Sequence, residues 1–255
     1  MLLYDKPVRL LMRDMIADLR ILPGNVFDKA VVISWFAKQY PKVKEGTISA
    51  HLVLLSTNNA GRLHHNPKST GEDDLFFKLD AGHFRLYEAK NDPSPLYKAP
   101  RTPSDTNSDN EEANEWESPT VDRVGASEFA YERDLRNFLA KHLSLIEDGL
   151  RLYEEDGITG IEFPVGGRFV DLLAVDSSNS LVVLELKVSR GYDRVVGQLL
   201  RYMAWIEKHQ ADLGQKVRGV IIAKKISEDL ILACSKVPNV SLYEYELSVT
   251  LKRAA

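Results

Sequence analysis

The chain has 255 residues, of which 44% are hydrophobic and 27% are charged, as in an ordinary globular protein. This length accommodates one large domain or two modest ones. No apolar run approaches the ~20 residues of a membrane helix, and charges interrupt the N-terminal segment too often for a secretory signal. The single cysteine, Cys234, excludes an internal disulfide framework. We therefore expect a cytoplasmic protein with no membrane partner.

Charge divides the sequence into three segments. Residues 1–98 hold 14 Lys and Arg against 11 Asp and Glu, and residues 128–255 hold 17 against 19. Residues 99–127 hold 2 against 7 and are rich in Pro, Ser, Thr and Asn, with almost no apolar periodicity. Such a composition is typical of a flexible linker. The sequence therefore predicts two domains, residues 1–98 and 127–255, joined by an acidic linker over residues 99–126.

Three helices and a β-hairpin are predicted in the N-terminal domain. Apolar residues recur at helical spacing over residues 7–19, 28–41 and 44–58, and Pro and Gly residues separate these stretches. Residues 74–88 contain two short strand patterns around an Asp-Ala-Gly turn, which is a hairpin signal. The order of these elements resembles the winged-helix modules found beside restriction-type nuclease domains.

The winged-helix resemblance implies that the third helix enters the major groove of DNA. The side chains that it would present there are Lys44, Thr47, Ser49 and His51. The following loop adds amide, basic and imidazole groups suited to base edges and phosphates, namely Asn58, Asn59, Arg62, His64 and Lys68. A winged helix used only for protein contacts is the alternative.

A mixed α/β fold is predicted for the C-terminal domain. Strand patterns occur over residues 158–165, 168–176, 181–189, 217–223 and 240–249. Helical periodicity occurs over residues 126–146, 192–209 and 227–236. The order helix, three strands, helix, strand, helix, strand indicates a sheet flanked by helices.

Charged residues interrupt two neighbouring strands of this sheet. Glu185 and Lys187 follow an apolar run, and because strand side chains alternate, both point to the same face. Asp171 interrupts the preceding strand, and the short turn at residues 177–179 makes the two strands neighbours. Two adjacent carboxylates repel each other unless a cation compensates them, and Mg²⁺ prefers such oxygen ligands. A structural ion pair of Asp171 or Glu185 with Lys187 is the alternative.

These residues belong to a wider pattern, in which an Asp in one strand is followed by Glu-x-Lys in the next and by GQLLRY in a helix. The pattern resembles the PD-(D/E)XK nuclease superfamily and, within it, the RecB-like nuclease domain of NucS/EndoMS-type DNA endonucleases. The matching stretches are residues 132–152, 166–176, 181–191 and 196–206. The resemblance implies a restriction-endonuclease-like α/β fold, a central mixed sheet flanked by helices, beside a smaller N-terminal winged-helix domain.

The resemblance also implies roles for individual residues. Asp171, Glu185 and the carbonyl of Leu186 would hold Mg²⁺ or Mn²⁺, and Lys187 would orient or activate the attacking water. Other groups of the site would be Gln198 and Tyr202 on the downstream helix, Glu132 on the first helix, and Arg201 as a DNA contact. For Glu132, a solvated helix carboxylate is the alternative.

Two features depart from the family pattern. Val170 stands where the superfamily's name has proline, and residues 1–98 lack the β-rich character of the NucS N-terminal domain, so neither mismatch specificity nor that family's dimer is carried over. The expected function is that of a Mg²⁺-dependent DNA endonuclease in restriction, defence or repair, with DNA as partner and a homodimer left open. A non-catalytic DNA-binding protein that keeps the nuclease fold as a scaffold is the alternative.

Overall fold

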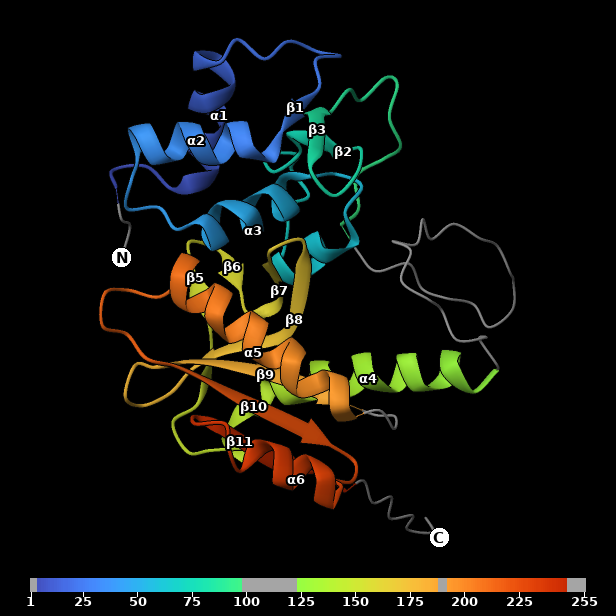
Figure 1. Cartoon of the computed structure of the whole chain (residues 1–255). Coiled ribbons are helices and arrows are strands. Elements are labelled where there is room, and N and C mark those ends of the chain that lie inside the picture. The colour runs from blue at the N-terminus through green and yellow to red at the C-terminus, as the bar shows by residue number, and fades with distance from the viewer. Residues whose placement is uncertain (1–3, 98–122, 188–191, 247–255) are drawn as a thin grey trace, which may run out of the picture.

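The computed structural model describes residues 4–97, 123–187 and 192–246 (Figure 1). Nearly all of the predicted linker lies outside these ranges. The helix predicted at the start of the C-terminal half is α4 (Arg123–Lys141). In the part of the chain that is described, no helix combines the length and the apolarity that a membrane crossing requires.

A six-stranded mixed sheet forms the centre of the C-terminal half. β7, β8 and β9 form an antiparallel meander, β4 also pairs with β8, and β10 and β11 continue parallel to β9. The strands are β4 (Arg151–Leu152), β7 (Ile161–Val165), β8 (Arg168–Val175), β9 (Leu181–Lys187), β10 (Val217–Ala223) and β11 (Val240–Glu244). The predicted mixed α/β sheet is confirmed.

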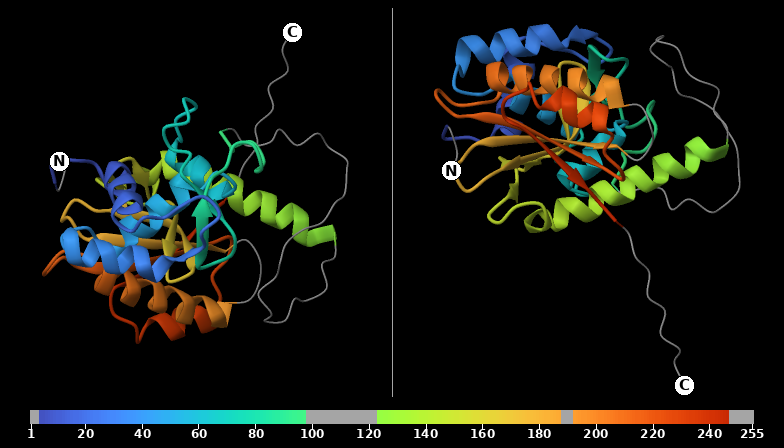
Figure 2. Two further views of the ribbon diagram at one scale, coloured as in Figure 1. Left: turned by 90° about the horizontal axis from the view of Figure 1, so that it is seen from above. Right: turned by 60° about the horizontal axis from the view of Figure 1, so that its bottom comes forward.

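Helices cover both faces of this sheet (Figure 2). On one face, α4 packs Leu135 and Leu139 into a cluster that contains Leu184 of β9. On the other face lie α5 (Tyr192–His209) and α6 (Glu228–Cys234). Because β9 is covered from both sides, six consecutive residues on it are buried. Any charged group on β9 before its last residue therefore lies inside the core.

The N-terminal half contains the three predicted helices and the predicted hairpin, to which a third short strand is added. The three strands pair in the order β1–β3–β2. The elements are α1 (Val8–Asp18), β1 (Phe27–Asp28), α2 (Lys29–Gln39), α3 (Glu45–Leu55), the 3₁₀ helix η1 (Ala60–His65), β2 (Phe76–Lys78) and β3 (His83–Leu86). The assignment of this half as a winged-helix DNA-binding module stays a prediction.

The third helix is buried between the two halves of the molecule, as Figure 1 shows. Every residue from Gly46 to Leu55 is buried, and α3 packs against β6, β7 and α5. A continuous apolar cluster runs from α3 into the C-terminal half, for example from Ile48 to Phe163. The prediction that α3 enters a DNA groove is therefore wrong for this arrangement, because no side of the helix is exposed enough to enter one.

A small hairpin that the sequence analysis missed holds α3 in place. It consists of β5 (Glu154–Glu155) and β6 (Ile158–Thr159). Thr47 Oγ1 donates a hydrogen bond of 2.5 Å to Glu155, and His51 Nε2 lies 3.5 Å from Asp156 Oδ2. The same Asp156 oxygen accepts a hydrogen bond of 2.6 Å from the backbone amide of Val8, at the start of α1.

The end of η1 also contacts this hairpin. The backbone amide of Thr159 donates to His65 Nδ1 at 3.2 Å, and the Thr159 hydroxyl donates to the carbonyl of His64 at 2.9 Å. Burial lowers the pKa of His65 to about 3. The imidazole ring of His65 is therefore uncharged at neutral and mildly acidic pH. Neutral His65 accepts the Thr159 hydrogen bond and serves the packing of the two halves.

The substitution Gly46→Ala tests how closely the halves are packed. A methyl group at this position would lie 2.1 Å from Gln210 Oε1 and 3.1 Å from Phe163 Cε1. Gln210 cannot move away freely, because its amide donates hydrogen bonds to the Tyr153 hydroxyl at 2.6 Å and to Thr47 Oγ1 at 3.2 Å. We expect the free energy of unfolding to fall by roughly 1–3 kcal/mol, as measured by chemical denaturation.

Gly197→Ala is the matched control. Gly197 lies in α5, and a methyl group there meets no other atom within 4 Å. Replacing an unhindered helical glycine with alanine stabilises a protein by roughly 0.5–1 kcal/mol. A Gly46→Ala variant as stable as the wild type would contradict the tight packing of α3 against the C-terminal half.

Candidate functional site

The register of β8 and β9 places two carboxylates side by side. Leu172 pairs with Leu184 in the antiparallel ladder, so Asp171 and Glu185 are the next neighbours along the two strands. Asp171 Oδ2 accepts a hydrogen bond of 2.8 Å from the backbone amide of Leu186. This hydrogen bond fixes the Asp171 side chain at the side of β9 that carries the second carboxylate. The predicted juxtaposition of the two acids is present.

Glu185 is the most buried of the charged groups here, with 2% of its surface exposed. Its Oε1 atom lies 2.9 Å from Lys187 Nζ and accepts a hydrogen bond of 2.6 Å from Gln198 Nε2. Gln198 Nε2 also lies within hydrogen-bonding distance, 3.2 Å, of the Tyr202 hydroxyl. The other carboxylate oxygen, Oε2, is buried and has no hydrogen-bond partner among the described residues. Oε1 therefore has hydrogen-bond partners, and Oε2 has none among the described residues.

Burial and mutual repulsion disfavour the charged forms of both acids. Burial, with the charge of Asp171 added to it, raises the pKa of Glu185 to about 7. Burial also raises the pKa of Asp171, although the Leu186 amide and the nearby cations act against this shift. For Lys187, burial acts to lower the pKa, but the surrounding carboxylates, Glu185 first, outweigh it and raise the pKa. Lys187 is therefore held in its protonated form.

A divalent cation fits the unsatisfied part of this site. It would supply a partner for Glu185 Oε2 and would remove the repulsion between Glu185 and Asp171. The protein would supply only a few ligands to this cation. In the described residues, no three His, Cys, Asp or Glu side chains lie close enough together to form a metal-binding group. The Leu186 amide contacts Asp171, and the predicted role of the Leu186 carbonyl as a ligand stays a prediction.

Two residues that the sequence analysis missed, Arg136 and Glu162, extend the site. Arg136 of α4 lies 3.6 Å from Asp171 Oδ1 and 2.5 Å from Glu162 Oε1. Glu162 Oε2 in turn lies 3.3 Å from Nε2 of His64 in the N-terminal half. A chain of charged groups thus leads from Asp171 to η1. In the sequence, Arg136 could have been found from its position four residues after Glu132, since residues at that spacing share a helix face.

Glu132 and Arg201 lie on the helices on either side of the sheet. The charge of Glu132 contributes to raising the pKa values of both Glu185 and Lys187, and its predicted role in the site stays a prediction. Arg201 on α5 is exposed, next to the buried Tyr202.

Val170, in the position of the superfamily's proline, is buried in β8 opposite Phe163 of β7. The strand therefore forms without a proline.

Several predicted DNA contacts are buried, and these assignments are corrected. Thr47, Ser49 and His51 lie in the buried helix α3, where they serve the packing of the two halves. Arg62 is completely buried, and its guanidinium forms an ion pair of 2.8 Å with Asp74. The Arg62 guanidinium and the Thr47 hydroxyl, which are enclosed in this way and paired with Asp74 and Glu155, cannot reach a phosphate or a base edge.

The other predicted contacts of the N-terminal half have partners within the protein. The side chain of Lys44 forms an ion pair of 3.0 Å with Asp212, and that of Lys68 pairs with Glu72. His64 pairs with Glu162, as described above. The two asparagine side chains form hydrogen bonds with the protein backbone. Asn58 forms two with the backbone of Lys78, and Asn59 accepts one from the backbone N–H of Gly61 at the start of η1.

The C-terminal half therefore combines a mixed α/β sheet with two adjacent carboxylates and a lysine, the arrangement expected from its resemblance to PD-(D/E)XK nuclease domains. In agreement with this, residues 131–237 match the Endonuclease NucS C-terminal domain family. Residues 7–86 match a domain of unknown function, DUF7669. The resemblance of the C-terminal half to NucS-type nucleases is confirmed.

Individual relatives match only part of the chain. Endonuclease NucS of Thermococcus kodakarensis (strain ATCC BAA-918 / JCM 12380 / KOD1) is 34% identical over 97 residues, which are 38% of this chain and 34% of the relative. A repair endonuclease from Pyrococcus abyssi is 24% identical, with a TM-score of 0.37 over 52% of this chain and 50% of that chain. A structure of an EndoMS–dsDNA complex is 23% identical, with a TM-score of 0.38 over 54% and 51%. The chain thus spans about a third of the curated relative and about half of each solved chain.

The raised pKa of Glu185 predicts a dependence of stability on pH. An unfolded glutamate ionises near its ordinary pKa of 4.5, whereas folded Glu185 stays protonated up to about pH 7. Folding therefore opposes ionisation, and metal-free protein should lose stability as the pH rises from about 4.5 to about 7. Relative to Glu185→Gln, which does not ionise, we expect a loss on the order of 3 kcal/mol.

Chemical denaturation of both proteins in EDTA, at several pH values, measures this difference. Adding Mg²⁺ above pH 7 should restore part of the stability of the wild type and should leave Glu185→Gln nearly unchanged. A constant difference in unfolding free energy across this pH range would contradict the raised pKa.

Proposed function

We propose that this protein is a divalent-metal-dependent DNA endonuclease. The observation that carries the proposal is the Glu185 carboxylate, which is buried beside Asp171 with Oε2 unsatisfied and with Lys187 and Gln198 on its other oxygen. The match of residues 131–237 to the Endonuclease NucS C-terminal domain supports it, as does the relative named Endonuclease NucS. The biological context, restriction, defence or repair, stays a prediction.

In this proposal, the side chains of β8 and β9 bind and orient the reacting groups. Asp171 and Glu185 would hold Mg²⁺ or Mn²⁺. A bound cation would polarise the scissile phosphate and lower the pKa of a bound water. The Gln198 amide fixes the orientation of Glu185, and Arg136 and the Leu186 amide fix that of Asp171.

Lys187 has a role that follows from its protonation. The surrounding carboxylates, Glu185 first, raise its pKa, so Lys187 carries a proton at neutral pH in the metal-free protein. A protonated amine beside the metal site stabilises the negative charge that develops on the phosphate during hydrolysis. In its protonated form Lys187 would act as an electrostatic donor to the phosphate or to the attacking water.

Three variants test this function. Labelled DNA is incubated with the full chain in Mg²⁺, in Mn²⁺ and in EDTA. We expect Glu185→Gln and Lys187→Met to cut at least ~10²–10³ times more slowly than the wild type, because each loses a group required in the transition state. Their DNA affinity should change little, since most of it comes from phosphate contacts elsewhere. Lys208→Ala, an exposed lysine near the end of α5, is the charge-matched control and should cut normally.

The outcome also separates the proposal from the alternative. A non-catalytic DNA-binding protein on a nuclease scaffold would bind DNA and release no product with either metal. Cleavage by Glu185→Gln at the wild-type rate, in preparations free of contaminating nuclease, would refute the assignment of the site.

A further inference from the structure

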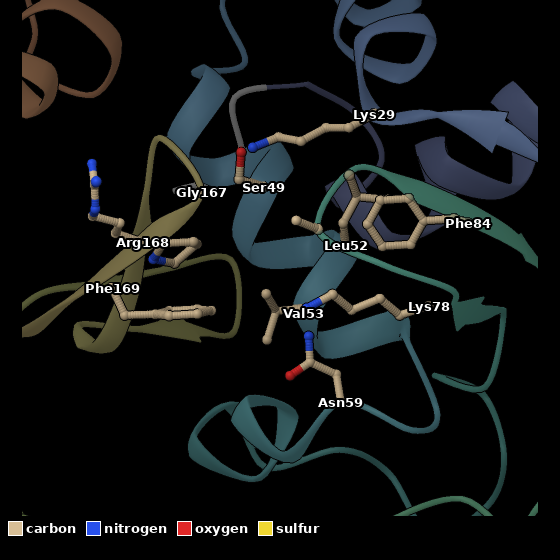
Figure 3. Close-up of a pocket in the computed structure, with 12 residues that line it drawn as sticks. Lys29, Ser49, Leu52, Val53, Asn59, Lys78, Phe84, Gly167, Arg168 and Phe169 are labelled. Atoms are coloured by element: carbon tan, nitrogen blue, oxygen red, sulfur yellow. The ribbon is translucent and has the colours of Figure 1, made fainter. Parts of the chain in front are cut away.

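A pocket lies where the N-terminal half meets the turn between β7 and β8 (Figure 3). Lys29, at the start of α2, and Lys78, at the end of β2, direct their side chains into it from the N-terminal half. Arg168 and Phe169, the first residues of β8, form the opposite wall. Ser49 of α3 lies between the two walls. The pocket therefore joins the two halves at the strand that carries Asp171.

The pocket is cationic and contains no compensating acid. Its lining includes Lys29, Lys78 and Arg168 but no Asp or Glu. In the described ranges none of these three cations has an ion-pair partner within 4.0 Å, in contrast to Lys44 and Arg62, which are paired. The two lysines are partly removed from water, which is costly for an unpaired charge, and an anionic ligand would compensate that cost.

Lys29 shows this cost most clearly. Its side chain is half-buried, and burial lowers the pKa of its amine, although the charge of Glu45 acts in the opposite direction. Lys78 is held in position by the two hydrogen bonds between its backbone and the Asn58 side chain, at 2.8 and 2.9 Å. Lys29 is thus half-buried, and Lys78 lies on a strand whose backbone is fixed by Asn58, as expected of groups that bind an anion in one place.

Arg168 links the pocket to the candidate active site. It precedes Asp171 by three residues on β8, which corresponds to about 10 Å along an extended strand. Its charge lowers the pKa of the Tyr202 hydroxyl, opposing the burial that raises it, and Tyr202 contacts Gln198 beside Glu185. About 10 Å spans roughly three nucleotide steps of 3.4 Å along one strand of DNA. A strand at Asp171 can therefore reach the pocket.

We propose that this pocket binds the phosphodiester backbone of the DNA strand whose scissile phosphate lies at Asp171 and Glu185. The inference rests on the proposed function and adds the surface by which the N-terminal half contacts the substrate. α3 contributes Ser49, Leu52 and Val53 to a pocket wall and reads no groove. Lys29 and Lys78 bind phosphate oxygens, Arg168 continues the contact toward the active site, and Phe169 offers an apolar surface to the sugars.

The test measures DNA binding in the full chain, with Glu185→Gln present in every protein so that the DNA is not cut. Fluorescence anisotropy with a labelled 30-base-pair duplex, at several salt concentrations, gives the affinity and its salt dependence. Lys29→Ala with Lys78→Ala should weaken binding at least tenfold near 0.1 M salt. The slope of log K against log salt should fall by about 1.8, because each lost phosphate contact contributes about 0.9.

Lys38→Ala with Lys90→Ala is the matched control, since it removes the same charge from two exposed lysines outside the pocket. Lys38 lies on the same helix as Lys29, about 13 Å away along its axis. The control pair should change the affinity less than threefold. Lys29→Arg with Lys78→Arg should keep most of the affinity, which shows that charge in the pocket is required and that loss of folding is not the cause.

Three results would overturn the inference: no binding of DNA by the parent protein, unchanged affinity in the pocket variant, or an equal loss in the control pair. The inference and the proposed function can fail separately. If the otherwise unmodified protein never cuts DNA but the pocket variant loses binding, the function fails and the pocket stands. If that protein cuts DNA and the pocket variant binds it normally, the function stands and the pocket fails.

Discussion

The C-terminal half of this protein is organised around one buried carboxylate. Glu185 lies on a strand that is covered on both faces, and only one of its oxygens has partners in the described part of the chain. Lys187 and Gln198 both contact that oxygen, and Asp171 is held beside it by the Leu186 amide. A buried carboxylate next to a second one is unfavourable unless it is protonated or meets a cation. The arrangement of Asp171 and Glu185 is therefore unfavourable in itself, and packing elsewhere in the protein offsets its cost in stability.

The N-terminal half is docked firmly onto this nuclease-like half. α3 is packed against β6, β7 and α5, the hydrogen bond from Thr47 to Glu155 fixes its position, and that from the Val8 amide to Asp156 fixes the start of α1. A module held in this way does not reorient independently of the C-terminal half. The pocket at the junction of the two halves, lined by Lys29, Lys78 and Arg168, lies at the start of β8.

The neighbouring positions of Asp171 and Glu185 could be predicted from the sequence because local rules determine them. The short turn at residues 177–179 fixes the register of β8 and β9, and alternation along each strand then decides which side chains share a face. Gln198 was expected from the family resemblance, and Tyr202 lies four residues later on the same helix face. Arg136 and Glu162 were missed because their contacts join elements far apart in the chain, and no local pattern shows which helix face meets which strand.

The role of α3 was mispredicted for a reason that the sequence itself contains. From Ile48 to Leu55 this helix is apolar on nearly all sides, and a helix of that kind is usually buried all round. The resemblance to a winged helix favoured an exposed third helix and overrode this pattern. Arg62 illustrates the remaining difficulty, since a basic loop residue can pair with a phosphate or with a buried acid such as Asp74, and only the fold decides.

The most direct test of a metal bound between Asp171 and Glu185 is affinity cleavage of the protein. Fe²⁺ replaces Mg²⁺ in the full chain, and ascorbate with hydrogen peroxide then generates hydroxyl radicals that cut the polypeptide near the metal. Mass spectrometry of the fragments should locate cuts close to residues 171 and 185, which excess Mg²⁺ suppresses and Asp171→Asn abolishes. Cuts confined to other parts of the chain, or an unchanged pattern in Asp171→Asn, would contradict a metal at this site.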